Sequence, residues 1–237
     1  MKKIVILGDF NPAYHTHLAV NETIRHLADA FNDDIAFEWV DTDKLDIKKD
    51  LNTRYSGIWV ASGSPYKDMQ NVINAIQYAR ENNIPTFGNC GGFQHMIIEY
   101  ARNVCGITDA DSEETKPGGK NLVISQMSCS LVGQQEEISV AENSKLYSLV
   151  QKKHLIGKYH CSYALNPEYI PVLKTQVPFR GFRGRIKMTA TNPEGTIRAF
   201  ELPSHRFFIG TLFQPALTST ADEPNPILMG FVKSVMT

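Results

Sequence analysis

The 237-residue sequence lacks the features that mark several classes of protein. It has no run of 18 apolar residues, and the apolar stretch near its N-terminus is too short for a signal peptide. It also has no polybasic block and no acidic tail, and its net charge is −1. These absences argue against a membrane or a nucleic acid as the main partner, and we expect a cytoplasmic protein.

Cysteine is scarce, and the sequence contains no complete cofactor motif. The four cysteines, at positions 90, 105, 129 and 161, have neither metal-site spacing nor a small secreted scaffold around them. Free thiols in a reducing compartment are the natural interpretation. No phosphate-binding loop is present, and Gly8 does not open a full Gly-x-Gly-x-x-Gly pattern. We therefore predict no cofactor and no bound metal.

The first hundred residues alternate between predicted strands and helices. Strands are expected at 4–7, 35–40, 58–60 and 84–87, and helical spacing of apolar residues is found at 18–31 and 66–80. This alternation predicts a parallel, doubly wound sheet, whose ligands bind at the carboxyl ends of the strands.

The second half of the chain is less regular. Predicted strands, several of them antiparallel, lie at 122–124, 137–140, 159–164, 188–190, 197–201 and 207–213, with loops at 111–121 and 178–185. No repeat and no linker divides the chain, so residues 1–237 are predicted to form one domain. The predicted fold class is α/β: a doubly wound, mostly parallel sheet with flanking helices and additional antiparallel strands.

The most informative segment is a cysteine between glycines, where a predicted strand meets a predicted helix. Its sequence is Gly88-Asn89-Cys90-Gly91-Gly92-Phe93-Gln94. Such a corner is typical of the nucleophile elbow of α/β enzymes, because the glycines permit a strained turn. The positive end of the helix dipole favours the thiolate. A small buried cysteine is the alternative.

This segment resembles the nucleophile region of class I glutamine amidotransferases, in the form found at the C-terminus of CTP synthase. Further matching segments begin at Ala110, Tyr163, Pro203 and Phe213, so the resemblance covers essentially the whole chain. It also extends to stand-alone proteins related to that C-terminal region. The resemblance implies a flavodoxin-like fold, a glutamine-like ligand and a role in pyrimidine biosynthesis.

The resemblance also identifies residues that depart from the family. The family uses a cysteine nucleophile, a histidine base and a glutamate that orients the histidine, the last two in a His-Pro-Glu sequence. Here that position has Gln214-Pro215-Ala216. Glutamine cannot accept and return a proton near neutral pH, and alanine cannot orient a partner. The sequence therefore predicts a degenerate catalytic triad built on Cys90.

The resemblance also implies a ligand pocket, and some of its residues differ from those of the family. Glu114 matches the family's acidic residue for the substrate amine, although a solvated loop carboxylate is an equal alternative. Ser162 falls near the family's carboxylate-binding arginine. Gly63 matches the oxyanion-hole loop, or marks a plain tight turn. Gly91 and Gln94, on the elbow, are predicted to line the same pocket.

Other side chains offer substitutes for the missing groups. His160 and Cys161 are candidates for a base or a second thiol; otherwise they are a partly exposed strand residue and a small core residue. His95 is expected to pack or cap. His15 and His17 follow the first strand and are expected at the entry of a helix or the pocket rim, since a lone His-x-His pair is a weak metal signal.

A loop rich in arginine is another candidate binding element. Arg180, Arg183 and Arg185 alternate with Gly and Phe. They form either a carboxylate or phosphate clamp or a solvated loop.

Three functions remain open. The first is altered Cys-dependent chemistry on a small amine-bearing ligand, which would make the protein an enzyme. The second is a non-catalytic ligand sensor or regulatory subunit. The third is ammonia supply, in trans, to a separate CTP-forming synthetase. A homodimer is compatible with each of them.

Overall fold

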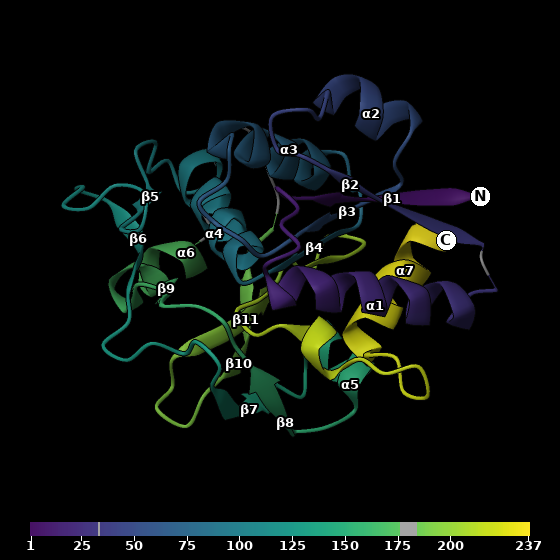
Figure 1. Cartoon of the computed structure of the whole chain (residues 1–237). Helices are drawn as coiled ribbons and strands as arrows, with labels where there is room; N and C mark the ends of the chain where they lie inside the picture. The colour runs from purple at the N-terminus through teal and green to yellow at the C-terminus, as the bar shows by residue number, and fades with distance from the viewer. Residues whose placement is uncertain (33, 176–183) are drawn as a thin grey trace.

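The computed structural model describes residues 1–32, 34–175 and 184–237. Within these residues, nine strands form one large sheet (Figure 1). In spatial order they are β2 (Ile35–Val40), β1 (Lys2–Leu7), β3 (Gly57–Val60), β4 (Thr86–Asn89), β12 (Phe208–Thr211), β11 (Ile197–Glu201), β10 (Lys187–Thr191), β7 (Gln135–Val140) and β8 (His154–Lys158).

The half of the sheet from β2 to β12 is parallel and is covered by helices on both faces. One face carries α1 (His15–Ala30) and α7 (Pro226–Met236), and the other carries α2 (Ile47–Thr53), α3 (Met69–Glu81) and α4 (Gly91–Asn103) (Figure 1). The predicted doubly wound α/β arrangement is confirmed.

The other half of the sheet, from β12 to β8, is antiparallel, as expected for several strands of the second half. A separate sheet of three strands contains β5 (Asp111–Ser112), β6 (Leu122–Gln126) and β9 (Tyr163–Leu165) in the described part of the chain. The short helix α6 (Ile170–Lys174) follows β9 after the turn η1 (Pro167–Tyr169).

The strand predicted at 159–164 is wrong over residues 159–162, and only its last two residues belong to a strand, β9. Strand β8 ends at Lys158 and β9 begins at Tyr163, and the chain between them has no strand partner in the described residues. Tyr159 and Cys161 are buried while His160 is exposed, which imitates the alternation of a strand. Their backbone groups bond instead to a neighbouring loop: Tyr159 N donates to Gln134 O, and Leu131 N donates to Cys161 O.

Other helices and strands begin or end at residues that differ from the predicted ones. Strand β4 begins two residues later than predicted, and β5 lies within the predicted loop at 111–121. The helix predicted from residue 66 begins at Met69, because the Asp68 side chain caps it by accepting a hydrogen bond from Asn71 N at 2.8 Å.

Four helices were not predicted from the sequence: α2, α5 (Lys145–Val150), α6 and α7. Most are only one or two turns long, too short to show helical periodicity. They are nonetheless signalled by their caps: Ser144 Oγ accepts from Tyr147 N before α5, and Asn225 Oδ1 accepts from Ile227 N before α7, which has Pro226 at its first position.

The buried stretches of the central strands β1 and β3 are apolar because both of their faces are covered. Residues 4–7 of β1 and 58–60 of β3 are completely shielded from solvent. This packing fixes the carboxyl ends of β3 and β4 side by side, at the edge where Gly63 and Cys90 follow. Across the described residues, no helix is long and apolar enough to cross a membrane.

Candidate active site

Cys90 occupies a strained corner between β4 and α4. Its φ is 50° and its ψ is −109°, and a non-glycine residue at positive φ costs about 1–3 kcal/mol. Its backbone N donates to Thr211 O at 2.9 Å, which ties the corner to β12. The start of α4 also packs closely against β3: a Cβ on Gly92 would lie 2.2 Å from the Val60 carbonyl oxygen.

The Cys90 side chain lines a cavity of about 270 Å³. The cavity lies at the carboxyl ends of β3, β4 and β12, where the topology predicts a ligand site. Of the residues proposed from sequence, those that line it are Cys90, Gly63, Gln94, Glu114, His160, Cys161, Ser162 and Gln214. Gly91 lies next to Cys90, and its carbonyl oxygen is 2.7 Å from His95 Nδ1.

A chain of hydrogen bonds fixes the orientation of Gln214. The Trp59 indole Nε1, which can only donate, bonds to Asn89 Oδ1 at 2.7 Å. Asn89 Nδ2 must then donate, and it bonds to Gln214 Oε1 at 2.7 Å. Gln214 Nε2 is left buried, without a hydrogen-bond partner in the described structure. Gln214, which the sequence predicts at the family's histidine position, therefore lines the cavity with an amide nitrogen that has no partner among the described residues.

The position behind Gln214 holds no acid. Ala216 is 5% exposed, and its carbonyl oxygen accepts a hydrogen bond from Thr23 Oγ1 at 3.3 Å. A methyl group cannot orient or charge-stabilise a base.

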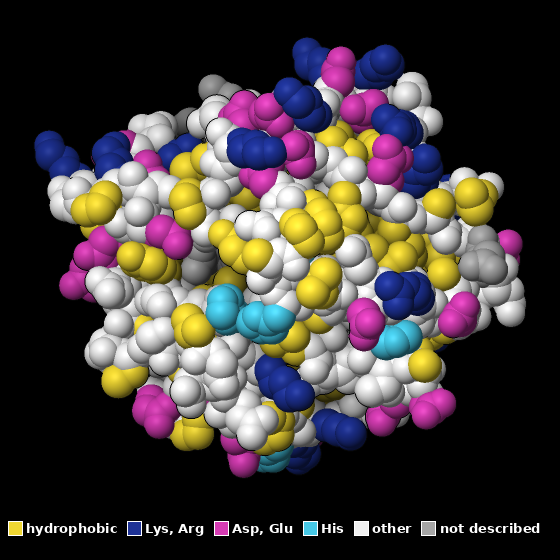
Figure 2. Space-filling model, viewed as in Figure 1, with side chains coloured by type: hydrophobic (Ala, Val, Ile, Leu, Met, Phe, Trp, Pro, Cys, Tyr) yellow, Lys and Arg dark blue, Asp and Glu magenta, His cyan; other side chains and the backbone are white. Residues whose placement is uncertain are grey.

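His160 contacts Cys90 with its backbone carbonyl group and not with its imidazole ring. The Cys90 thiol donates to the His160 carbonyl oxygen at 3.6 Å. The imidazole instead meets His15, with 4.6 Å between ring centroids, and histidine side chains gather beside the start of α1 in Figure 2. Burial, and then the charge of His15, lower the pKa of His160, which keeps the ring neutral near pH 7.

Cys161 is the second thiol of the cavity. It is 6% exposed, as is Cys90. A hydrogen-bonding interaction with Cys90, and then burial, raise the pKa of Cys161, against the opposing charge of Arg198. Arg198 itself is held by Glu136, with its Nε 2.8 Å from Oε2. All four cysteines are free.

Other side chains that line the cavity provide hydrogen-bond acceptors. Glu114 Oε2 accepts a hydrogen bond from Ser64 Oγ at 2.7 Å, which orients the carboxylate. Gln94 Nε2 donates to the Tyr163 carbonyl oxygen at 2.8 Å, so its Oε1 is left buried and unpartnered among the described residues. Ser162 Oγ is 2.9 Å from Ser130 Oγ, and offers no positive charge for a carboxylate.

Position 63 requires glycine, both because of its backbone conformation and because a buried histidine lies against it. Its φ is 109°, and a Cβ there would lie 2.8 Å from His17 Nε2. His17 Nδ1 accepts from Asn11 N at 3.0 Å, so Nε2 carries the proton and donates to the Ser62 carbonyl oxygen at 2.9 Å. Burial lowers the pKa of His17, so this ring is a neutral support of the Gly63 loop.

His95 is buried in α4, where its Nδ1 meets the carbonyl oxygen of Gly91. Burial lowers the pKa of His95 to about 4. His15 is the first residue of α1, as predicted for a helix entry. Arg180 and Arg183 lie outside the described residues, whereas Arg185 is exposed and is not part of the cavity lining.

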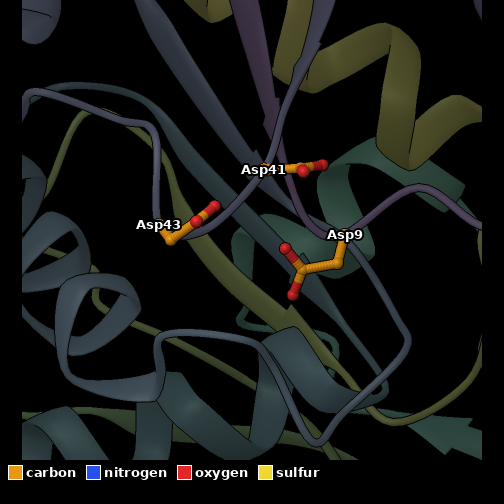
Figure 3. Close-up of side chains that lie close together, drawn as sticks. All are labelled: Asp9, Asp41 and Asp43. Carbon is orange, nitrogen blue, oxygen red and sulfur yellow. The ribbon is translucent and has the colours of Figure 1, made fainter.

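Three carboxylates lie close together outside the cavity: Asp9, Asp41 and Asp43 (Figure 3). Asp9 is already occupied by protein donors, with Thr42 N at 3.0 Å and Lys67 N at 2.8 Å. The Lys67 ammonium is 2.6 Å from Asp41 Oδ2. Protein donors thus already bind Asp9 and Asp41. Their hydrogen bonds connect the loops that follow β1, β2 and β3.

Several cavity residues were not predicted from sequence. Tyr14, Thr16, Ser64 and Val132 also line the cavity. Ser64 could have been found from its place just after β3, at the carboxyl edge of the sheet. Asn89 stands in the elbow motif, but only the fold reveals its bond to a residue 125 positions away.

The fold and the elbow define a class of protein. The model for glutamine amidotransferase class-I matches residues 15–234, and the chain belongs to this family.

Within the family, the chain is similar to CTP synthases. It is 29% identical over 242 residues to CTP synthase of Sulfolobus acidocaldarius and 31% identical over 245 residues to CTP synthase of Cytophaga hutchinsonii. These matches cover 97% and 98% of this chain, but the chain spans only 44% of the length of each relative.

Solved structures agree with this placement. The glutaminase domain of Trypanosoma brucei CTPS with bound acivicin matches with a TM-score of 0.86 and 25% identity, covering 100% of this chain and 94% of that chain. A glutamine amidotransferase from Thermotoga maritima shares the fold, with a TM-score of 0.60 and 11% identity, over 99% of this chain and 96% of that one.

Proposed function

We propose that the protein uses Cys90 for covalent chemistry on a small, amine-bearing, glutamine-like ligand, without efficient glutamine hydrolysis. The observation that carries this proposal is the pairing of a strained, cavity-lining thiol with an amide where the family has a base. The unpaired Gln214 Nε2 can donate a hydrogen bond that stabilises a thiolate or an oxyanion, but it cannot remove a proton.

The walls of the cavity support the choice of ligand. Glu114 and the unpartnered Gln94 Oε1 are acceptors, which suit the N–H groups of an amine. Gly63 lines the cavity with Cys90, and Gly91 begins α4 directly after Cys90, so we assign their backbone N–H groups as the donors for an oxyanion. In the proposed step, the Cys90 sulfur bonds to an electrophilic carbon, and the displaced electron pair moves to the oxygen or the leaving group.

The missing base limits the rate of amide hydrolysis. Loss of a triad base removes on the order of 10⁶ in kcat, with about 10³–10⁴ over water remaining from binding and oxyanion contacts. A thiol suffers less than a hydroxyl because some thiolate forms unaided. Reactions whose leaving group needs no proton are therefore favoured over hydrolysis of glutamine.

Labelling by diazo-oxo-norleucine, an electrophilic glutamine analogue, tests the proposal. Intact mass and peptide mapping are expected to show one adduct, on the tryptic peptide 81–102 that contains Cys90. Cys90→Ser should remove the adduct, and Cys129→Ser, which changes an exposed cysteine, should retain it. Absence of an adduct on every cysteine of the folded protein would overturn the proposal.

A second candidate is ammonia supply to a separate CTP-forming synthetase. Similarity to CTP synthases over 97% of the chain favours it, whereas Gln214 and Ala216 argue for a slow reaction. Ammonia release from L-glutamine by the purified protein, in the presence and absence of a synthetase, distinguishes the two candidates. Release at rates ordinary for amidotransferases would favour the second.

A further inference from the structure

The cavity contains two cysteines that come from distant parts of the chain. Cys90 follows β4, and Cys161 lies in the strandless segment between β8 and β9. Both side chains line the same cavity of about 270 Å³, and the two thiols are close enough to interact. The Cys90 thiol also reaches the carbonyl oxygen of His160, the residue just before Cys161, at 3.6 Å.

This contact places Cys161 where a resolving thiol would have to lie. A reversible redox site needs an accessible thiol that reacts first and a second thiol within bonding reach. Cys90 has a cavity in front of it and a helix N-terminus behind it, and helix N-termini favour thiolates. The hydrogen bond with Cys90 and burial raise the pKa of Cys161, so it remains the protonated partner.

The surroundings of Cys161 favour a bridge over further oxidation. The buried Arg198 guanidinium, which is 3% exposed, interacts favourably with a Cys161 thiolate and so assists the loss of its proton. The backbone on either side is tied down, since Tyr159 N bonds to Gln134 O and Leu131 N bonds to Cys161 O. The second thiol is therefore held next to the first rather than supplied by a free loop.

We propose that Cys90 and Cys161 form a peroxide-reactive dithiol site, which closes to a disulfide and thereby switches off the Cys90 nucleophile. The oxidant is a hydroperoxide. The Cys90 thiolate attacks the terminal peroxide oxygen and the O–O bond breaks, leaving a sulfenic acid. The departing alkoxide, or hydroxide in the case of hydrogen peroxide, takes up a proton to become an alcohol or water. Cys161 then loses its proton and attacks that sulfur, the S–O bond breaks, and water leaves. Two electrons pass from the two thiols to the peroxide.

The site shares its thiol with the proposed function but does not depend on the identity of the ligand. A protein that is never labelled by diazo-oxo-norleucine would contradict the proposed function alone. A protein that is labelled but forms no bridge would contradict the dithiol site alone.

Peptide mapping of the full chain, treated with hydrogen peroxide at near-stoichiometric amounts, tests the inference. The four cysteines fall in separate tryptic peptides, so a bridge between 81–102 and 159–174 identifies the Cys90–Cys161 pair. We expect that linked pair, a loss of two hydrogens from the intact mass, and a fall from four free thiols to two. Dithiothreitol should restore the thiols and the labelling by diazo-oxo-norleucine.

Cysteine variants separate the two steps. Cys161→Ser should accumulate a sulfenic acid on Cys90, which dimedone traps, while Cys90→Ser should form no bridge. Cys105→Ser is the matched control, since Cys105 is partly buried elsewhere and should leave the bridge intact. If a variant does not fold, the wild-type mapping still decides. Oxidation of Cys90 to sulfinic acid without a bridge, or bridges only between molecules, would overturn the inference.

Discussion

Asn89 Nδ2 donates a hydrogen bond to Gln214 Oε1 at 2.7 Å, across 125 positions of sequence. Trp59 fixes the direction of this bond from behind, because its indole nitrogen can only donate. The amide nitrogen of Gln214 is thus held as a donor in the cavity of Cys90. In this member of the class I glutamine amidotransferase family, the side chain at position 214 that lines the cavity is an amide, which cannot take up a proton near neutral pH.

Restoring the base should restore glutamine hydrolysis. We expect Gln214→His with Ala216→Glu to raise glutaminase activity by on the order of 10²–10⁴, the contribution of a positioned general base. Ammonia release measures the gain, and the same pair of changes in a Cys90→Ala background should show none. Because Ala216 is buried, Gln214→His alone is the second variant, with a smaller gain. Two folded variants without any gain would show that the cavity has lost more than its relay.

Glu114 should recognise the amine of the ligand. Glu114→Gln is expected to weaken L-glutamine binding about tenfold or more, because a charge-assisted hydrogen bond is lost. Glutaramic acid, which lacks the α-amine, should bind equally to both proteins in calorimetric titrations. Glu113→Gln is the matched control, since Glu113 does not line the cavity. Equal losses for the two ligands would contradict an amine-specific role.

Acid should destabilise the protein through His95. The pKa of this buried ring is lowered from 6.5 to about 4, so the unfolded chain takes up a proton first as the pH falls. Stability is therefore lost between pH 6.5 and about 4, by on the order of 3 kcal/mol from this site. Urea unfolding at several pH values should show a flatter profile for His95→Gln. The exposed His154→Gln should keep the wild-type slope, and identical slopes for all three proteins would refute this cause.

The contact between the elbow helix and β3 should not tolerate a side chain. Gly92→Ala would bring a Cβ to 2.2 Å from the Val60 carbonyl oxygen, and we expect a loss of about 2–4 kcal/mol in unfolding free energy. Gly195→Ala is the control: it has open space but a φ of 79°, so only backbone strain of about 1 kcal/mol applies. Urea denaturation midpoints compare the two, and equal losses would argue against a steric cause.

Much of the parallel half of the fold could be predicted from sequence. Residues 4–7 of β1 and 58–60 of β3 are continuous apolar runs, and covering both faces of a parallel sheet demands such runs. The glycine-flanked cysteine between a strand and a helix likewise predicted a corner at the sheet edge. The strand predicted at 159–164 is wrong over residues 159–162. Buried and exposed side chains alternate in a strand, but they alternate equally in a segment whose backbone is hydrogen-bonded to a loop.

The sequence by itself determined the α/β architecture and the Cys90 corner, since apolar periodicity and glycine placement are local properties of the chain. Only the tertiary structure decided which atom of the Gln214 amide is left unpaired, which thiol shares the cavity with Cys90, and that the His160 ring meets His15. These contacts join residues far apart in the chain, and hydrogen-bond direction depends on partners that the fold alone brings together.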